Sequence, residues 1–244
     1  KIKPDTNAVS NWKHKYDGPY VISGKLDGIS ALYSTENGIK KLYTRGKATV
    51  GMDISYLIPH LRLPNTENIT IRGELIIKKE KFEQKYSDYY KCARNFVAGT
   101  INGKEMDPDK FSDIDFVSYE VINPELEPAM QMHWLENNNV FCVKNKIYDS
   151  IGNESLSSIL ISWRDSYEYE IDGIIITDNK IYERINKNPK HSFAFKMVLS
   201  DQIMESKVVD VHWSPSKYGY LKPRVQIEPI TIKGATIEYV TGHN

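Results

Sequence analysis

Lys25 is the side chain in this sequence whose setting best suits covalent chemistry. It opens the segment Lys25-Leu26-Asp27-Gly28, which lies between two apolar runs, residues 20–23 and 29–33, that we interpret as strands. A neutral lysine amine is a nucleophile, and its pKa can be lowered by its environment. A single lysine between strands is more often a solvated surface residue, and the pattern K-x-D-G occurs by chance in roughly one chain in twenty of this length. The rest of the chain must therefore decide between these two interpretations.

Four more polar clusters lie at the ends of predicted strands. They are Thr44-Arg45-Gly46, Arg72-Gly73-Glu74, Asp172-Gly173 and Phe195-Lys196. An arginine is always charged and forms several hydrogen bonds at once, which suits ribose or phosphate. Taken alone, Arg45 would be interpreted as a surface salt-bridge residue and Glu74 as a solvated carboxylate. The functional argument therefore depends on the whole set and its order along the chain.

The elements that must position these clusters are mostly strands. Alternating and β-branched runs predict strands at residues 20–33 (two strands around the lysine), 40–44, 70–78, 116–122, 140–143, 171–177, 192–198, 207–213, 224–232 and 236–240. Helices are predicted at residues 79–86, 94–101, 127–137 and 154–167, with a short one capped by Asp53. This content indicates an α+β fold of largely antiparallel sheets with flanking helices. Without a long linker, we expect one domain over residues 1–244, with residues 1–18 as an irregular leader.

Composition excludes several classes of protein. Hydrophobic residues make up 40% and charged residues 26% of the chain, as in ordinary globular proteins. No apolar run approaches the roughly 20 residues that span a bilayer, so we expect no membrane association. Cys92 and Cys142 are too few for a disulfide framework, and the histidines show no zinc-ligand spacing. Reduced cysteines favour an intracellular location.

The clusters, in this order, resemble the adenylation (nucleotidyltransferase) domain of NAD-dependent DNA ligases. The resemblance covers almost the whole chain, from the nucleophile motif K-x-D-G through the arginine loop at Arg45 and the R-G-E strand at Glu74 to the A-x-K-F motif at Lys196. Two segments are typical of the NAD-dependent branch in particular. These are residues 93–100, similar to P-R-N-x-x-A-G-S, and residues 219–244, similar to G-x-L-x-P-V-A-x-L-E-P-V followed by H-N. Seven ordered matches make a chance resemblance negligible.

The resemblance implies a nucleotidyltransferase (ATP-grasp-like) fold and covalent chemistry at Lys25. In this family the lysine attacks the α-phosphorus of NAD, expels nicotinamide mononucleotide and keeps AMP for a 5′-phosphate in nicked double-stranded DNA. We expect such a protein to act as a monomer. The resemblance also implies roles for the other polar clusters. Arg45 would contact ribose or phosphate, Glu74 the ribose hydroxyls, and Lys196 the α-phosphate, while Asp172 would help to hold Mg²⁺.

Three further residues acquire roles from the resemblance alone. Tyr119 corresponds to the aromatic residue that stacks on adenine, although an aromatic residue in a strand more often belongs to the core. Ile175, or its neighbour Ile174, would form the opposite wall of the adenine site. Arg94 lies on the family's arginine motif and would face phosphate or DNA.

The chain also departs from the family pattern. Ser23 replaces a glutamate, and Thr177 replaces a lysine whose charge is then missing or supplied by Lys180. Lys47, Ala48 and Met52 replace residues of the arginine loop. These differences suggest a divergent branch, viral or phage-borne.

Only 24 residues precede Lys25. We therefore expect the N-terminal module that reads nicotinamide and the C-terminal OB-fold to be absent from this chain. Such a core should hold AMP, react poorly with NAD and not seal nicks by itself.

Two other functions stay open from the sequence. An ATP-dependent polynucleotide ligase shares the fold, but its last lysine motif usually reads K-x-K, and Lys196-Met197-Val198 lacks the second lysine. A non-catalytic module that binds nucleic acid could also retain the fold. The intact Lys25, Glu74 and Asp172 argue against that second possibility.

Overall fold

The computed structural model describes residues 7–46, 50–103, 107–185, 188–197, 204–232 and 235–242. It divides the chain into two compact units, an N-terminal unit of residues 1–197 and a C-terminal unit of residues 198–244. The sequence had led us to expect one domain over residues 1–244. In the described ranges each sheet draws its strands from one unit only.

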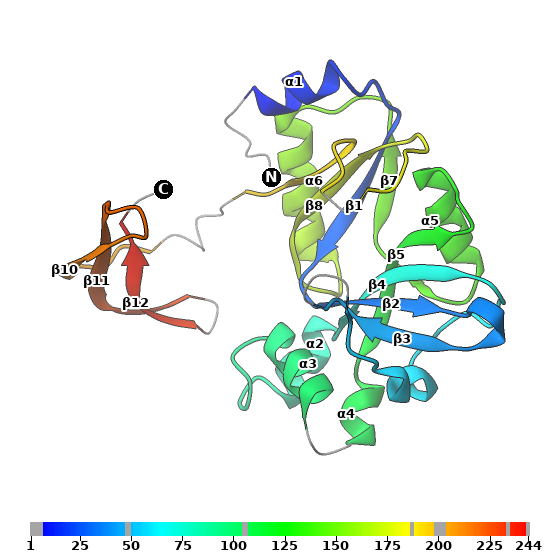
Figure 1. The fold of residues 1–244 in the computed structure, drawn as a ribbon, viewed down its shortest axis with the longest axis horizontal. Coiled ribbons are helices and arrows are strands. Elements are labelled where there is room, and N and C mark those ends of the chain that lie inside the picture. The colour runs from blue at the N-terminus through cyan, green and yellow to red at the C-terminus, as the bar shows by residue number, and fades with distance from the viewer. Residues whose placement is uncertain are drawn as a thin grey trace. The chain divides into compact units, whose positions relative to one another are not determined.

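The N-terminal unit contains two sheets (Figure 1). The first sheet has the order β7-β1-β8-β9, and all its neighbours are antiparallel. Its strands are β1 (Tyr20–Leu26), β7 (Asn145–Tyr148), β8 (Ile171–Asp178) and β9 (Ser192–Phe195). The second sheet has the order β3-β2-β4-β5-β6 and is antiparallel except for the pair β5–β6. Its strands are β2 (Ile29–Ser34), β3 (Lys41–Thr44), β4 (Thr70–Ile76), β5 (Asp115–Asn123) and β6 (Phe141–Cys142).

Helices flank both sheets. They are α1 (Ala8–Lys13), α2 (Lys79–Lys85), α3 (Ala93–Asn102), α4 (Pro108–Ser112), α5 (Pro128–Asn137) and α6 (Asn153–Ser166), with 3-10 turns η1 (Glu36–Gly38) and η2 (Ser55–His60). Helix α3 packs against β2 and β4, α5 against β5 and β6, and α6 against β8 (Figure 1). The described part of the C-terminal unit is one antiparallel sheet of β10 (Val208–Pro215), β11 (Leu221–Ile232) and β12 (Ala235–Thr241). The mixed α+β fold with mainly antiparallel sheets confirms the predicted class.

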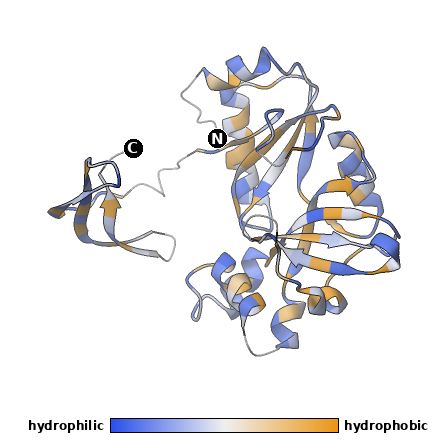
Figure 2. Cartoon of the chain, viewed as in Figure 1, coloured by the Kyte–Doolittle hydropathy of each residue, from blue (hydrophilic) through white to orange (hydrophobic). Residues whose placement is uncertain are grey.

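Burial alternates along β1 and β8 of the first sheet, so that one face of these strands belongs to the core and the other to the site. Ile22, Ile174 and Ile176 are fully buried, whereas their neighbours Ser23 and Ile175 are only partly buried. Helix α6 supplies the matching apolar stripe, Leu156, Leu160 and Trp163, as its periodicity predicts. Figure 2 shows the hydrophobic residues spread over the strands and interspersed with hydrophilic ones along the helices. One face of the sheet therefore anchors the unit, and the other face is available for binding.

The structure differs from the sequence predictions mainly near the N-terminus and in short elements. Residues 8–13, expected to be irregular, form α1, because Val9 is buried and the Trp12 ring packs edge-on against Phe193 with centroids 4.8 Å apart. Elements α4 and β7 were not predicted. The turn after Asp53 is a 3-10 helix whose N-cap residue is Ile54 rather than Asp53, although the Asp53 carboxylate accepts a hydrogen bond from the Ser55 amide at 2.9 Å. Predicted positions 47, 48, 198, 234, 243 and 244 lie outside the described residues.

Two predictions from composition can be compared with the structure. Cys92 and Cys142 are free thiols. Within the described ranges, none of the helices has both the length and the apolar character needed to cross a membrane.

Candidate active site

Strand pairing across the chain brings Lys25 to Asp172. Strand β1 pairs with β8 so that Lys25 lies opposite Gly173, next to Asp172, with an irregularity in register between Lys25 and Leu26. The ammonium nitrogen of Lys25 is 2.8 Å from an Asp172 carboxylate oxygen. Both side chains are about one-third exposed, so the ion pair is reached by solvent on one side. The predicted nucleophile and the predicted metal ligand are therefore direct neighbours.

Asp172 also binds Lys196, the residue that follows β9. The second carboxylate oxygen of Asp172 accepts a hydrogen bond from the Lys196 ammonium. Burial acts to raise the pKa of Asp172, but the hydrogen bonds from Lys196 and Lys25 outweigh it and hold the pKa below its ordinary value. The carboxylate is thus kept ionised between two cations. Three predicted catalytic residues, separated by up to 171 positions (196 − 25), form one charged cluster.

Glu74 lies on β4, in the second sheet. Burial raises the pKa of Glu74 to about 7, and this exceeds the lowering effects of the Lys25 and Arg94 charges and of the Gly28 amide. Gly28 is required for this close approach, because a side-chain carbon at position 28 would lie 2.3 Å from the Leu75 carbonyl oxygen. The glycine of the lysine motif therefore lets the β1–β2 connection pack against the strand that carries Glu74.

Two arginines approach the lysine from other elements. Arg94, in the first turn of α3, forms an ion pair with Asp27 at 3.0 Å. Arg94 is thus the side-chain partner of the aspartate in the Lys25 motif. Arg45 follows β3, and its backbone amide donates to the Ser30 carbonyl at 3.1 Å. Both arginines line the same cavity as Lys25.

The cavity has a volume of about 910 Å³ and is lined by residues of both sheets of the N-terminal unit. Ser23, Lys25 and Ile175 come from the first sheet, and Glu74 and Tyr119 come from the second. The Tyr119 hydroxyl and the Ser30 hydroxyl are hydrogen bonded at 2.8 Å, which orients the ring. Asp172 and Lys196 are not among the lining residues and join the site through Lys25. All eight residues predicted for the site thus belong to the cavity or to its charged cluster.

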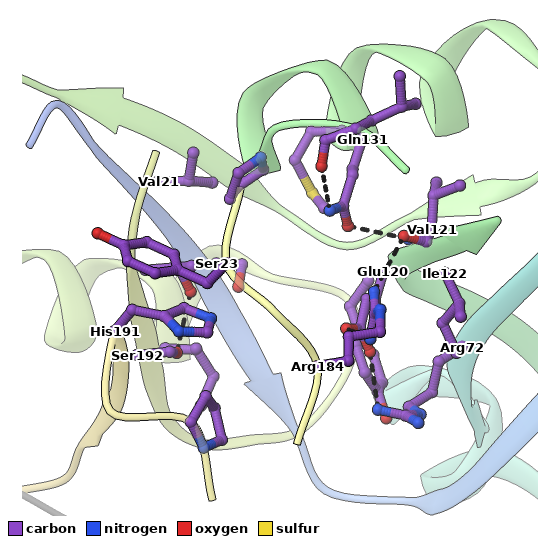
Figure 3. Close-up of a pocket in the computed structure, with 18 of the residues that line it drawn as sticks. Val21, Ser23, Arg72, Glu120, Val121, Ile122, Gln131, Arg184, His191 and Ser192 are labelled. Carbon is purple, nitrogen blue, oxygen red and sulfur yellow. Dashed lines mark hydrogen bonds and ion pairs between the residues drawn. The ribbon is translucent and has the colours of Figure 1, made fainter. Parts of the chain in front are cut away.

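A second group of lining residues, on the loop between β8 and β9, was not predicted from the sequence. Arg184 of this loop binds Glu120 at 2.6 Å, and Glu120 also binds Arg72 at 2.8 Å, across the cavity from His191 and Ser192 (Figure 3). Tyr182 stacks on His191 with ring centroids 4.3 Å apart. The loop carries no motif, so only the three-dimensional structure could reveal these residues. Lys180, considered as a substitute for the missing lysine, has its ammonium 2.6 Å from Asp17.

A known family model matches most of the chain. The family model for the NAD-dependent DNA ligase adenylation domain matches residues 6–199. The chain belongs to this family. The match ends two residues beyond the N-terminal unit, so this unit corresponds to the adenylation domain.

Proteins with similar sequences are named DNA ligases. A DNA ligase of Acanthamoeba polyphaga mimivirus is 40% identical over 253 residues, which include 100% of this chain and 39% of the relative. A DNA ligase of Leptospira interrogans is 30% identical over 267 residues, with 98% of this chain and 38% of the relative covered. The chain therefore spans less than half of the length of these relatives. Viral proteins are among its relatives, in agreement with a divergent branch.

A solved structure supports the fold of the adenylation domain. The structure described as Pmar-Lig_PreS3 superposes with a TM-score of 0.58 at 14% identity, covering 98% of this chain and 55% of that one. At this identity the similarity concerns the fold alone.

Proposed function

We propose that this adenylation domain transfers AMP from NAD to Lys25 and releases nicotinamide mononucleotide. The observation that carries the proposal is the position of the Lys25 amine. It lies on the wall of a cavity of about 910 Å³, with Asp172 at 2.8 Å and the partly buried Glu74 beside it. A solvated surface lysine would have neither the cavity nor these partners. The arrangement therefore supports the interpretation of Lys25 as a nucleophile.

The proposed step forms one phosphorus–nitrogen bond and breaks one phosphorus–oxygen bond. Lys25 first releases a proton to solvent, because only the neutral amine has a lone pair for the attack. Its nitrogen then attacks the α-phosphorus that carries adenosine, and the bridging oxygen leaves with nicotinamide mononucleotide. A second proton leaves the nitrogen as the phosphoramidate forms. No oxidant or reductant is needed, so NAD serves here as a nucleotide donor.

Charged neighbours would stabilise the phosphate during this step. Lys196 and Arg45 would neutralise the negative charge that develops on the phosphate oxygens. Asp172 is suited to be one ligand of Mg²⁺, since such sites often combine one or two carboxylates with substrate phosphates and water. No three His, Cys, Asp or Glu side chains of the described residues form a metal-binding group, so the substrate would complete the coordination. Mg²⁺, when bound, would reduce the repulsion between phosphate and any incoming electron pair.

The remaining residues would hold the nucleoside. Glu74 is placed to accept hydrogen bonds from the ribose hydroxyls, and Tyr119 and Ile175 would enclose the adenine ring from the two sheets. Arg94 would face phosphate or DNA. These assignments rest on the resemblance and on the fact that all four side chains line the same cavity.

The longer protein that contains this chain would use the stored AMP on DNA. We propose that it transfers AMP to a 5′-phosphate at a nick in double-stranded DNA and then seals the strand. We also propose that it acts as a monomer inside the cell. These proposals concern a whole ligase, because the chain covers 39% and 38% of the length of its two relatives.

A direct test is covalent labelling of the full-length protein. Incubation with NAD and Mg²⁺ should add the mass of AMP, and the Lys25→Ala variant should show no addition. ATP, tested in parallel, should give little product if the family assignment extends to the nucleotide. Labelling of Lys25→Ala at the rate of the unmodified protein would contradict the proposal.

A further inference from the structure

Three hydroxyl-bearing side chains form one end of the cavity wall. Ser23 of β1, Thr177 of β8 and Ser192 of β9 all line the cavity. Thr177 lies opposite Val21 on one side and Ser192 on the other, and the Thr177 and Ser192 hydroxyls are hydrogen bonded at 3.0 Å. Ser23 is two residues closer to Lys25 along β1 than Val21 is, and it lies opposite Ile175. The Ser23 hydroxyl has no hydrogen-bond partner among the residues that the structure describes.

The distance from Lys25 places these hydroxyls where a nucleobase would lie. Alternate residues of a strand point to the same face, so Val21, Ser23 and Lys25 share one face of β1. At about 3.3 Å per residue, Ser23 lies roughly 7 Å and Val21 roughly 13 Å along the strand from Lys25. A nucleotide whose α-phosphate meets the Lys25 amine extends over this range, with the ribose first and the base last. The row of Ser23 and the row of Thr177 and Ser192 would therefore face the base.

Base recognition by this sheet must come from side chains. Strand β1 lies between β7 and β8, and β8 lies between β1 and β9. Their backbone amide and carbonyl groups are committed to ladders on both sides and are not available to a ligand lying on the face of the sheet. The uncharged polar side chains that β1, β8 and β9 place on the cavity wall are then those of Ser23, Thr177 and Ser192.

Hydroxyl groups distinguish poorly between related purines. A hydroxyl both donates and accepts a hydrogen bond, whereas a carboxylate only accepts. Adenine presents an amino donor at C6, and hypoxanthine presents a carbonyl acceptor there. The family pattern has a glutamate where this chain has Ser23 and a lysine where it has Thr177, so both charged groups are absent at these positions. A carboxylate or an ammonium at these positions would reject a purine with the wrong group at C6, and Ser23, Thr177 and Ser192 carry no charge.

The other carboxylates of the cavity do not replace the missing one. Glu74 lies beside Lys25, at the phosphate and ribose end. Glu120 is held by Arg72 and Arg184 on the opposite wall (Figure 3). Glu125 and Glu183 are exposed, where water competes for their hydrogen bonds.

We propose that this adenylation domain accepts 6-oxopurine dinucleotides as well as NAD, because Ser23, Thr177 and Ser192 can pair with either a donor or an acceptor at C6. This inference rests on the proposed function and concerns the substrate range of the same site. The probe is nicotinamide hypoxanthine dinucleotide, which keeps both phosphates and the nicotinamide half unchanged. The chemistry at Lys25 is then identical for the two substrates.

The experiment compares the two substrates on the full-length protein. Release of nicotinamide mononucleotide, the product common to both, gives the rate of a single turnover with each. The unmodified protein should use the two substrates with rates within about tenfold of each other. Ser23→Glu should raise the preference for NAD by about tenfold or more, because the carboxylate accepts from the adenine amino group and opposes the hypoxanthine carbonyl.

Two variants keep the result interpretable. Ser23→Ala removes the hydroxyl without adding charge and should leave the ratio of the two rates within about threefold of its original value. Ser192→Asp places a carboxylate on the neighbouring strand and should also favour NAD, which covers the case in which Ser23→Glu does not fold. Thermal unfolding identifies any variant that is not folded.

The outcomes separate this inference from the proposed function. A preference of the unmodified protein for NAD of more than about a hundredfold would overturn the inference and leave the function intact. An unchanged ratio in every folded carboxylate variant would also overturn it. Failure to release nicotinamide mononucleotide from NAD itself would contradict the function.

Discussion

The two units of this chain bury their apolar residues very differently. The N-terminal unit has a continuous core that includes fully buried side chains from both sheets and from α3, α5 and α6. In the described part of the C-terminal unit, Ile227 is the single buried hydrophobic residue. Large apolar side chains there are mostly exposed, among them Trp213 at 62% and Leu221 at 64%.

This difference shows where the chain can hold a site rigidly. A buried core fixes the strands that carry Lys25, Glu74 and Asp172, so their side chains keep their relative positions. A three-stranded sheet with one buried apolar residue gains little free energy from burial and is marginal by itself. The predictions below test whether function and stability both reside mainly in the N-terminal unit.

The largest effect should come from Lys25 itself. Lys25→Ala should abolish covalent nucleotide addition, because it removes the amine that lines the cavity beside Asp172, and Lys196, which also contacts Asp172, is not a lining residue. Lys25→Arg is the matched control, since arginine keeps the positive charge but stays protonated at neutral pH and is not a nucleophile. Intact mass after incubation with NAD should show no adduct in either variant, while thermal unfolding stays close to that of the unmodified protein. An adduct in Lys25→Arg would mean that another residue is the nucleophile.

Replacing a leucine by alanine should reduce the free energy of unfolding much more in the N-terminal unit than in the C-terminal unit. Leu160 of α6 is fully buried in the N-terminal unit, and Leu160→Ala should lower the free energy of unfolding by about 2–5 kcal/mol. Leu221→Ala makes the same change at a side chain that is 64% exposed and should shift it by no more than about 0.5 kcal/mol. Urea unfolding measures both. Equal losses would show that the C-terminal sheet is supported by burial comparable to that of the core.

Glu74 should make stability depend on pH. Its pKa rises from 4.5 to about 7 on folding, so the folded state binds more protons than the unfolded state between these values. Stability should therefore fall as pH rises from about 4.5 to 7, by about 3 kcal/mol at most. Glu74→Gln should lose this slope and be more stable than the unmodified protein at pH 8, with less difference at pH 5. Urea unfolding at several pH values measures the slope, and an unchanged slope in the variant would exclude Glu74 as its source.

The smallest effect concerns exposed polar contacts. Arg184→Gln breaks the contact with Glu120 at the cavity and should cost about 1 kcal/mol or less, because Arg184 is 47% exposed. Asp210→Asn in the C-terminal unit removes a longer contact with His212, 3.7 Å away, and should change stability by less than about 0.5 kcal/mol. Thermal unfolding in low and high salt compares the two. A larger loss for Asp210→Asn would reverse the expected order.

Much of the fold could be predicted because it is encoded in short segments. Alternation and β-branching located most strands, and the stripe of Leu156, Leu160 and Trp163 located α6 within a residue or two. Helix α1 could not be predicted, since its apolar partner Phe193 lies far away in sequence and its six residues are too few to show a helical period.

The sequence by itself determined the family, and it predicted Lys25 as the nucleophile together with the side chains around it, because these are carried by residue types at short spacings. Only the tertiary structure decided how Asp172 joins Lys25 to Lys196, why the pKa of Glu74 is raised, and which hydroxyls line the cavity. These features depend on the ladder between β1 and β8, whose residues lie about 150 positions apart, and on the burial that follows from it. Local sequence contains no record of such contacts, because they form only when distant strands meet.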